Sequence, residues 1–155
     1  DHAMQLLNQS GMREPLESMV FGQQVPVLGV CVGMQMLASG SDEGVLPGLN
    51  WVPGRVRAFA STPEAAQLPM PHMGWNDLQV KPGAKLFSGF EPQPHFYFLH
   101  SYYFACDDKA HSVATVTYGQ KFDCVVSKGH IHGVQCHPEK SHHFGAQLLK
   151  NFAEL

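Results

Sequence analysis

The sequence is poor in charged side chains, and none of its surface can be strongly basic. Only 15% of the residues are charged, and 13 acidic against 10 basic residues give a net charge of -3 at pH 7. Bulk nucleic-acid binding and polybasic membrane attachment need an excess of Lys and Arg that is missing here. No apolar run approaches the roughly 20 residues of a membrane-spanning helix. We therefore expect no binding to nucleic acid and no membrane span.

Cysteine is too sparse for a disulfide framework. The chain has 4 cysteines in 155 residues, whereas small secreted domains are far denser in cysteine. No basic and then apolar signal segment opens the sequence, so we expect a reducing, cytoplasmic location. The length is typical of one domain. Because Asp1 comes first and Ala3 already belongs to a helical pattern, we expect a single domain, 1-155, that is incomplete at its N-terminus.

The order of apolar segments and turn residues predicts an α/β fold. Val25 to Val30 has no polar alternation, as in strands buried on both faces near the centre of a parallel sheet. Helices are expected over residues 2-9, 14-22, 33-40 and from a Ser141 cap onward, and strands over 55-59, 74-80, 95-103, 112-118, 122-127 and 131-136. The predicted architecture is a largely parallel mixed sheet flanked by helices, with antiparallel β additions.

A cysteine stands where this pattern turns from strand to helix. Gly29-Val30-Cys31-Val32-Gly33 has the layout of a nucleophile elbow, in which small flanking residues permit a tight turn. At such a place the helix N-terminus lowers a thiol pKa, and the N–H of Val32 can point at a developing oxyanion. Alternatively, Cys31 is a small buried apolar residue.

A base for this thiol is offered by His137-Pro138-Glu139. The triplet follows a predicted strand, and the carboxyl ends of parallel strands meet at one edge of a sheet. Because Pro138 restricts the backbone, the Glu139 carboxylate can reach one ring nitrogen of His137 while the other faces Cys31. A lone histidine is more often a hydrogen-bonded structural residue, but the elbow and the triplet together predict a thiol, imidazole and carboxylate site.

These motifs resemble those of a known family. Gly-Val-Cys-Val-Gly-Met-Gln (29-35) followed by His-Pro-Glu-Lys-Ser (137-141) resembles the class I, triad-type glutamine amidotransferases. Pro-His-Met-Gly-Trp-Asn (71-76) and Tyr-Phe-Leu-His-Ser-Tyr (97-102) are similar to motifs of the glutaminase subunits that serve histidine biosynthesis. The likeness covers nearly the whole chain.

The resemblance implies a reaction and a substrate site. Glutamine would be hydrolysed through a γ-glutamyl thioester, with Cys31 as nucleophile, His137 as proton relay and Glu139 as the group that orients His137. No cofactor is implied. The residues expected to hold glutamine are Gln35, Glu43, Ser101 and Tyr102.

The resemblance also implies a partner. Ammonia would pass to a cyclase subunit of (β/α)₈-barrel fold within a heterodimer, and Trp75, Tyr97 and Lys140 would face that subunit. The family's glycine-rich oxyanion loop has no counterpart from Asp1 onward, which leaves open whether the chain as written is active alone.

Two other functions remain open at this point. A cysteine hydrolase or peptidase of related fold would use the same three residues, although Gln35 and residues 97-102 favour the amidotransferase. A metal-binding protein is the second alternative, because imidazole and thiolate are ligands of zinc and nickel. Its ligands would come from His130, His132, Cys136, His137, His142 and His143. Cys136 itself would be a core residue or a disulfide partner of Cys31.

Overall fold

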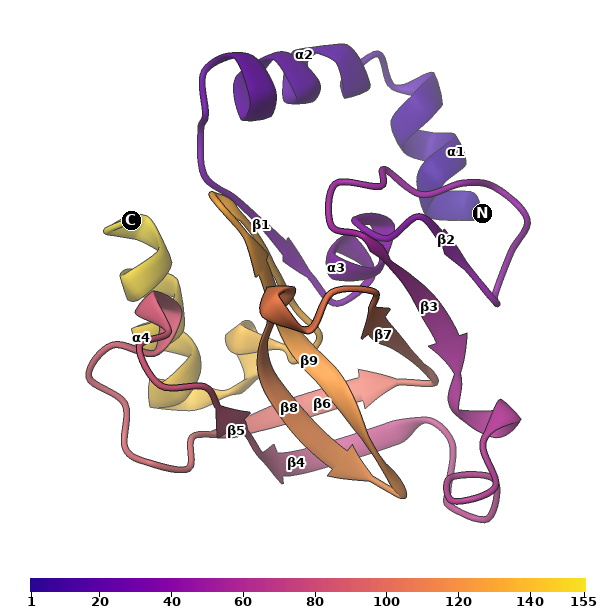
Figure 1. Cartoon of the computed structure of the whole chain (residues 1–155), viewed down its shortest axis with the longest axis vertical. Coiled ribbons are helices and arrows are strands. Elements are labelled where there is room, and N and C mark those ends of the chain that lie inside the picture. The colour runs from indigo at the N-terminus through magenta and orange to yellow at the C-terminus, as the bar shows by residue number, and fades with distance from the viewer.

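An eight-stranded mixed sheet forms the centre of the structure, a computed structural model that describes residues 1–155 (Figure 1). The strands are β1 (Val27–Val30), β2 (Gly40–Ser41), β3 (Gly54–Ala58), β4 (His72–Asp77), β5 (Gln79–Val80), β6 (His95–His100), β7 (Tyr102–Cys106), β8 (Ser112–Tyr118), β9 (Gln120–Lys128) and β10 (Ile131–Val134). The main path runs β1-β10-β9-β7-β3-β2, with β8 beside β9 and β5 beside β8. Strands β4 and β6 form a separate two-stranded sheet.

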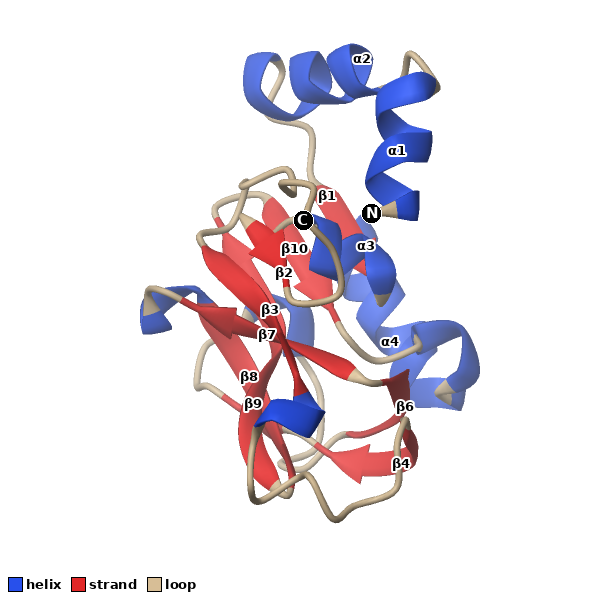
Figure 2. Cartoon of the chain, turned by 90° about the vertical axis from the view of Figure 1, so that its right-hand side faces the viewer, coloured by secondary structure: helices blue, strands red, loops and turns tan.

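The helices lie at the two ends of the chain and directly after β1. They are α1 (His2–Gln9), α2 (Arg13–Glu17), which runs on into a π-helical turn (Ser18–Gly22), α3 (Val32–Met36) and α4 (His142–Ala153). Short 3₁₀ turns occupy Phe59–Ser61, Lys85–Phe87, Lys109–His111 and Pro138–Lys140. Figure 2 shows α1 and α2 beyond the end of the sheet where β1 begins. No helix is long and apolar enough to cross a bilayer.

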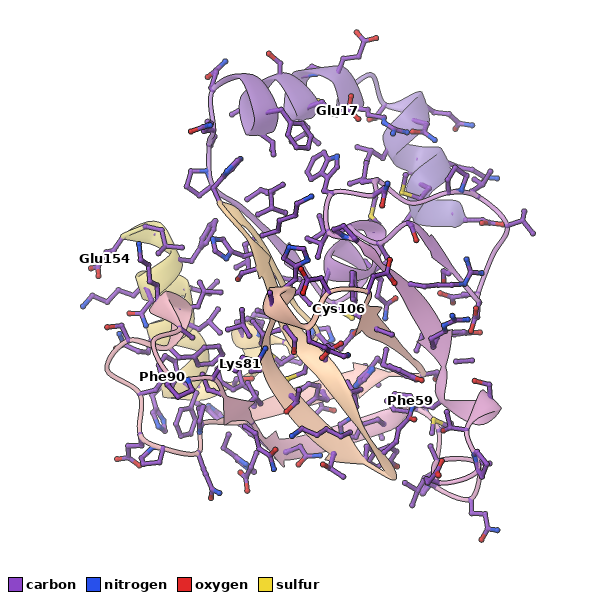
Figure 3. All side chains as sticks on the ribbon, viewed as in Figure 1. Glu17, Phe59, Lys81, Phe90, Cys106 and Glu154 are labelled. Atoms are coloured by element: carbon purple, nitrogen blue, oxygen red, sulfur yellow. The ribbon has the colours of Figure 1, made fainter.

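Two apolar cores lie on opposite faces of the sheet. The neighbouring residues Val125 and Val126 of β9 belong to different cores because successive side chains of a strand point to opposite faces. One core contains Leu148 of α4 and is bordered by Phe90, which is labelled beside α4 in Figure 3. The other contains Met34 of α3. Helices α3 and α4 therefore cover opposite faces, and the predicted α/β fold with flanking helices is confirmed.

The balance of parallel and antiparallel pairs differs from the prediction. Only β1–β10 and β2–β3 are parallel, whereas the other six pairs are antiparallel. The short turns between β8, β9 and β10 can join only antiparallel neighbours. Strand β1 is also not central: it is half-buried and pairs with β10 alone. An apolar run predicts that the side chains of a strand are covered by other parts of the chain, but it does not predict how many strands pair with it.

Several predicted boundaries were wrong for local reasons. Residues 95–103 are divided at Ser101 into two strands of different sheets, and the helix after Cys31 ends at Met36 instead of reaching Gly40. The Ser141 hydroxyl does not cap α4, because its oxygen accepts from the Tyr97 N–H at 3.0 Å while the hydroxyl donates to the His137 carbonyl at 2.7 Å. The N-terminal helix and the 112–118 strand are confirmed. The extent of the domain stays a prediction.

Candidate active site

Cys31 occupies the sharp turn between β1 and α3. Its backbone angles, φ 52° and ψ -108°, lie in a region that residues with a side chain rarely adopt. The turn depends on Gly29, because a Cβ there would lie 2.6 Å from backbone atoms of Gly33. A Cβ on Gly33 would meet nothing within 4 Å. The predicted elbow is thus confirmed as a strained turn, and only the first of its two glycines is sterically required.

His137 reaches the same edge of the sheet from the neighbouring strand. Strands β1 and β10 are parallel with Val30 opposite Val134, so the chain leaves both strands in the same direction. The Cys31 N–H donates to the Val134 carbonyl at 2.8 Å. His137 Nδ1 lies 2.7 Å from Glu139 Oε1, which confirms the expected contact across Pro138. His137 Nε2 is buried and has no partner in the chain.

The Cys31 thiol is not activated by its position alone, contrary to the prediction. Burial raises its pKa above the ordinary value, and the negative charge of Glu139 acts in the same direction. The Val32 N–H and the Gln135 side chain lower the pKa of Cys31, but burial is the largest effect. At rest Cys31 is therefore a thiol that needs a base.

Gln35 and Gln135 connect the elbow to β7. Gln35 Nε2 donates to the Tyr102 carbonyl at 3.2 Å and to Gln135 Oε1 at 3.0 Å, and Gln135 Nε2 donates to Cys31 Sγ at 3.6 Å. No sequence motif had pointed to Gln135. The sequence feature that could have indicated its role is its position directly after β10, just before Cys136 and His137.

The residues expected to hold glutamine are only partly brought together. Gln35, Glu43 and Val32 line one cleft of about 50 Å³, and the Glu43 side chain is exposed there. The Tyr102 carbonyl contacts Gln35, as described above. The Ser101 carbonyl instead accepts from the N–H of Phe59 at 3.2 Å and does not line this cleft.

The three residues expected at a partner interface lie together. Trp75 and Tyr97 are opposite one another on β4 and β6, with ring centroids 6.1 Å apart. Lys140 Nζ lies 5.7 Å from the Tyr97 ring centroid, within cation–π range. The Tyr97 carbonyl accepts the His137 N–H at 2.9 Å. Strand β6 therefore carries the Tyr97 ring and also holds the backbone of His137 through the Tyr97 carbonyl.

The histidine-rich C-terminal part forms no metal site. No group of three or more His, Cys, Asp or Glu side chains is placed to hold an ion. His130 Nε2 contacts the Val20 carbonyl at 2.6 Å, and His132 Nδ1 contacts the Ser127 hydroxyl at 2.7 Å. Cys136 is fully buried and is not in a disulfide. These contacts turn His130 and His132 toward separate partners.

Comparison with known proteins identifies the family of the chain. The model of the family "Glutamine amidotransferase class-I" matches residues 8–155, and the chain belongs to this family. Within it, the chain is 57% identical over 155 residues to the imidazole glycerol phosphate synthase subunit HisH of Bdellovibrio bacteriovorus and 46% identical over 155 residues to that of Leptospira interrogans. Each match covers 100% of this chain and 76% of the relative. The chain is a glutamine amidotransferase subunit of the HisH group.

Solved structures share the fold at low sequence identity. A glutamine amidotransferase crystal structure superposes with a TM-score of 0.68 at 17% identity, covering 96% of this chain and 72% of that one. A glutamine amidotransferase from Thermotoga maritima gives a TM-score of 0.57 at 21% identity, covering 90% of this chain and 50% of that one.

Proposed function

We propose that the chain hydrolyses glutamine to glutamate and ammonia through a thioester on Cys31. The observation that carries this proposal is the position of Cys31 and the His137–Glu139 pair after adjacent parallel strands. Cys31 Sγ attacks the side-chain amide carbon of glutamine while its proton passes to His137 Nε2. Glu139 stabilises the resulting imidazolium, which then protonates the amide nitrogen so that ammonia leaves.

Water completes the reaction. It attacks the thioester carbonyl as His137 takes one of its protons, and the carbon–sulfur bond breaks to release glutamate. The proton returns to the sulfur, so that the thiol is restored. In the resting protein the Val32 N–H forms a hydrogen bond with Cys31. We assign it the role of stabilising the oxyanion in both tetrahedral intermediates.

The substrate site is proposed beside this centre. Both hydrogens of the Gln35 amide are used within the chain, so its Oε1 is the atom left to accept from glutamine. Glu43, exposed in the same cleft, is the counter-charge for the α-ammonium group. Ser101 and Tyr102 are proposed to hold the backbone groups of glutamine by groups other than their carbonyls, which accept from Phe59, Gln35 and His100 within the chain.

The ammonia is proposed to serve a partner. The relatives are named as subunits of imidazole glycerol phosphate synthase, which supports a heterodimer with a (β/α)₈-barrel cyclase in cytoplasmic histidine biosynthesis. There ammonia would join a ribosyl-ribulosyl phosphate intermediate to give imidazole glycerol phosphate and an aminoimidazole carboxamide ribotide. Trp75, Tyr97 and Lys140 would contact the cyclase, and Tyr97 would transmit that contact to His137 through its carbonyl.

The test is a glutaminase assay with and without the cyclase and its ligand. We expect ammonia release from glutamine that rises when both are added, and that is lost in Cys31→Ala. The assembled Cys31→Ala complex should still make product from free ammonia, because that route needs no thiol. Cleavage of peptides without turnover of glutamine would instead assign the site to a hydrolase of another class.

A further inference from the structure

Two histidines outside the proposed triad lie buried against each other. His72 of β4 and His100 of β6 are paired in register, and their side chains are almost fully buried. His72 Nδ1 is 2.9 Å from His100 Nε2. His100 Nδ1 is 2.7 Å from the Tyr102 carbonyl oxygen. The pair therefore ends on the carbonyl that also binds Gln35.

The partners of the two rings fix where their hydrogens lie. A carbonyl only accepts, so His100 Nδ1 carries a hydrogen, and its Nε2 in the neutral ring accepts from His72 Nδ1–H. His72 Nε2 then faces the amide nitrogen of Asn76 at 3.4 Å, which donates. Burial lowers the pKa of His72 to about 4 and that of His100 to about 3, which keeps both rings neutral at pH 7. The hydrogen bonds are therefore all donated in one direction, from Asn76 through His72 and His100 to the Tyr102 carbonyl.

The Tyr102 carbonyl determines the amide orientations on its other side. It accepts from His100 and Gln35, which fills both of its acceptor positions. Gln35 gives its second hydrogen to Gln135 Oε1, so Gln135 must present its nitrogen to Cys31 Sγ. If Gln135 turned over, its oxygen would face the sulfur and the donor would be lost.

We propose that His72 and His100 are positioning residues for Cys31, because they hold the Tyr102 carbonyl that orients Gln35 and Gln135. The role deepens the proposed function, since it matters to catalysis only if Cys31 is the nucleophile. Hydrogen bonds in such a chain polarise one another, so loss of the first donor weakens the last.

The test is the rate at which iodoacetamide alkylates Cys31 in the intact chain, followed by peptide mass spectrometry across neutral and alkaline pH. In His100→Phe the Tyr102 carbonyl loses its donor, and we expect the rate at neutral pH to fall roughly threefold to tenfold, the value of one net hydrogen bond. The pH profile should move to higher pH. Asn places a donor at the δ position, so His100→Asn should stay within about twofold of the unsubstituted chain. Glu139, the charged group that acts on the thiol, is unchanged in every variant.

His95→Phe is the matched control, since His95 lies on the same strand, outside this chain of hydrogen bonds, and should leave the rate unchanged. An unchanged rate in His100→Phe, or an equal loss in His100→Asn, would overturn the proposal. Nitrogen-15 NMR of the unsubstituted protein gives a second test that needs no variant to fold. We expect the Nδ1–H tautomer for both rings at neutral pH, and Nε2–H on His100 would contradict it. Because alkylation needs no glutamine, the experiment tests the positioning role of His72 and His100 even if the chain does not hydrolyse glutamine.

Discussion

Oε1 of Glu139 lies 2.7 Å from Nδ1 of His137, with only Pro138 between the two residues in the chain. A carboxylate accepts, so His137 Nδ1 carries the hydrogen and Nε2 of the neutral ring is left with a lone pair. That nitrogen is buried and has no partner in the chain. The contact thus fixes the tautomer that can take a proton from a thiol.

Replacing the base should cost more than replacing the group that orients it. We expect His137→Ala to reduce glutamine turnover by about 10²- to 10⁴-fold, the usual contribution of a general base. Glu139→Gln keeps an oxygen that accepts from Nδ1–H and should lose less. The measurement is steady-state ammonia release from both variants. Equal losses, or a larger loss in Glu139→Gln, would contradict the two roles.

Glu139→Gln should also separate thiol reactivity from catalysis. The Glu139 charge raises the pKa of Cys31, so its removal should increase the fraction of thiolate at neutral pH. We expect faster alkylation of Cys31 in this variant although its turnover of glutamine is slower. Glu154→Gln is the control, because Glu154 is an exposed residue near the C-terminus. This substitution should change neither rate. Slower alkylation of Glu139→Gln would show that this charge does not act on the sulfur as described.

The two glycines of the elbow should respond differently to alanine. Gly29→Ala places a Cβ 2.6 Å from the Gly33 carbonyl carbon and oxygen, so the turn must shift, at a cost of about 1 to 3 kcal/mol. Gly33→Ala meets no atom within 4 Å and should change the free energy of unfolding by less than about 0.5 kcal/mol. Urea unfolding of both variants measures this. Similar losses would mean that Gly33 has a role in the elbow that space does not explain.

The buried histidine pair should make stability depend on pH. The pKa values of His72 and His100, about 4 and about 3, lie below the ordinary value of 6.5, so the unfolded chain binds protons first as the pH falls. The free energy of unfolding should therefore fall between pH 6.5 and about 3, by at most about 1.4 kcal/mol per pH unit for each ring.

The slope against pH, and not the absolute stability, is the quantity to compare. The double substitution His72→Phe with His100→Phe should flatten it between pH 6.5 and 4, whereas His2→Phe, on the exposed face of α1, should not. An unchanged slope in the double variant would show that the pair titrates normally.

The local chemistry of the site could be predicted because it is encoded over a few residues. Gly29 to Gly33 specifies a turn, and the two-residue offset from His137 to Glu139 specifies a contact. The pKa of Cys31 could not be predicted in the same way. It depends on burial in the folded chain, and burial exceeds the opposing effects of the Val32 N–H and the Gln135 side chain.

Sheet order was the least predictable part of the fold. The composition of Val27–Val30 gives the type of element but not its neighbours, so β1 was expected at the centre and lies at one end of the strand order. The division of residues 95–103 at Ser101 depends on pairing with β3 and β4, which no local pattern contains. Gln135 was missed because its role depends on Gln35, a hundred residues away.

The most direct test of Cys31 as the nucleophile is a search for the covalent intermediate. The protein is mixed with glutamine, quenched in acid and digested, and the Cys31 peptide is weighed by mass spectrometry. We predict a γ-glutamyl adduct on Cys31 that is absent from Cys31→Ala and persists in Cys106→Ala, whose thiol is buried. Continued turnover in Cys31→Ala, or an adduct on another residue, would contradict the claim that this sulfur is the nucleophile.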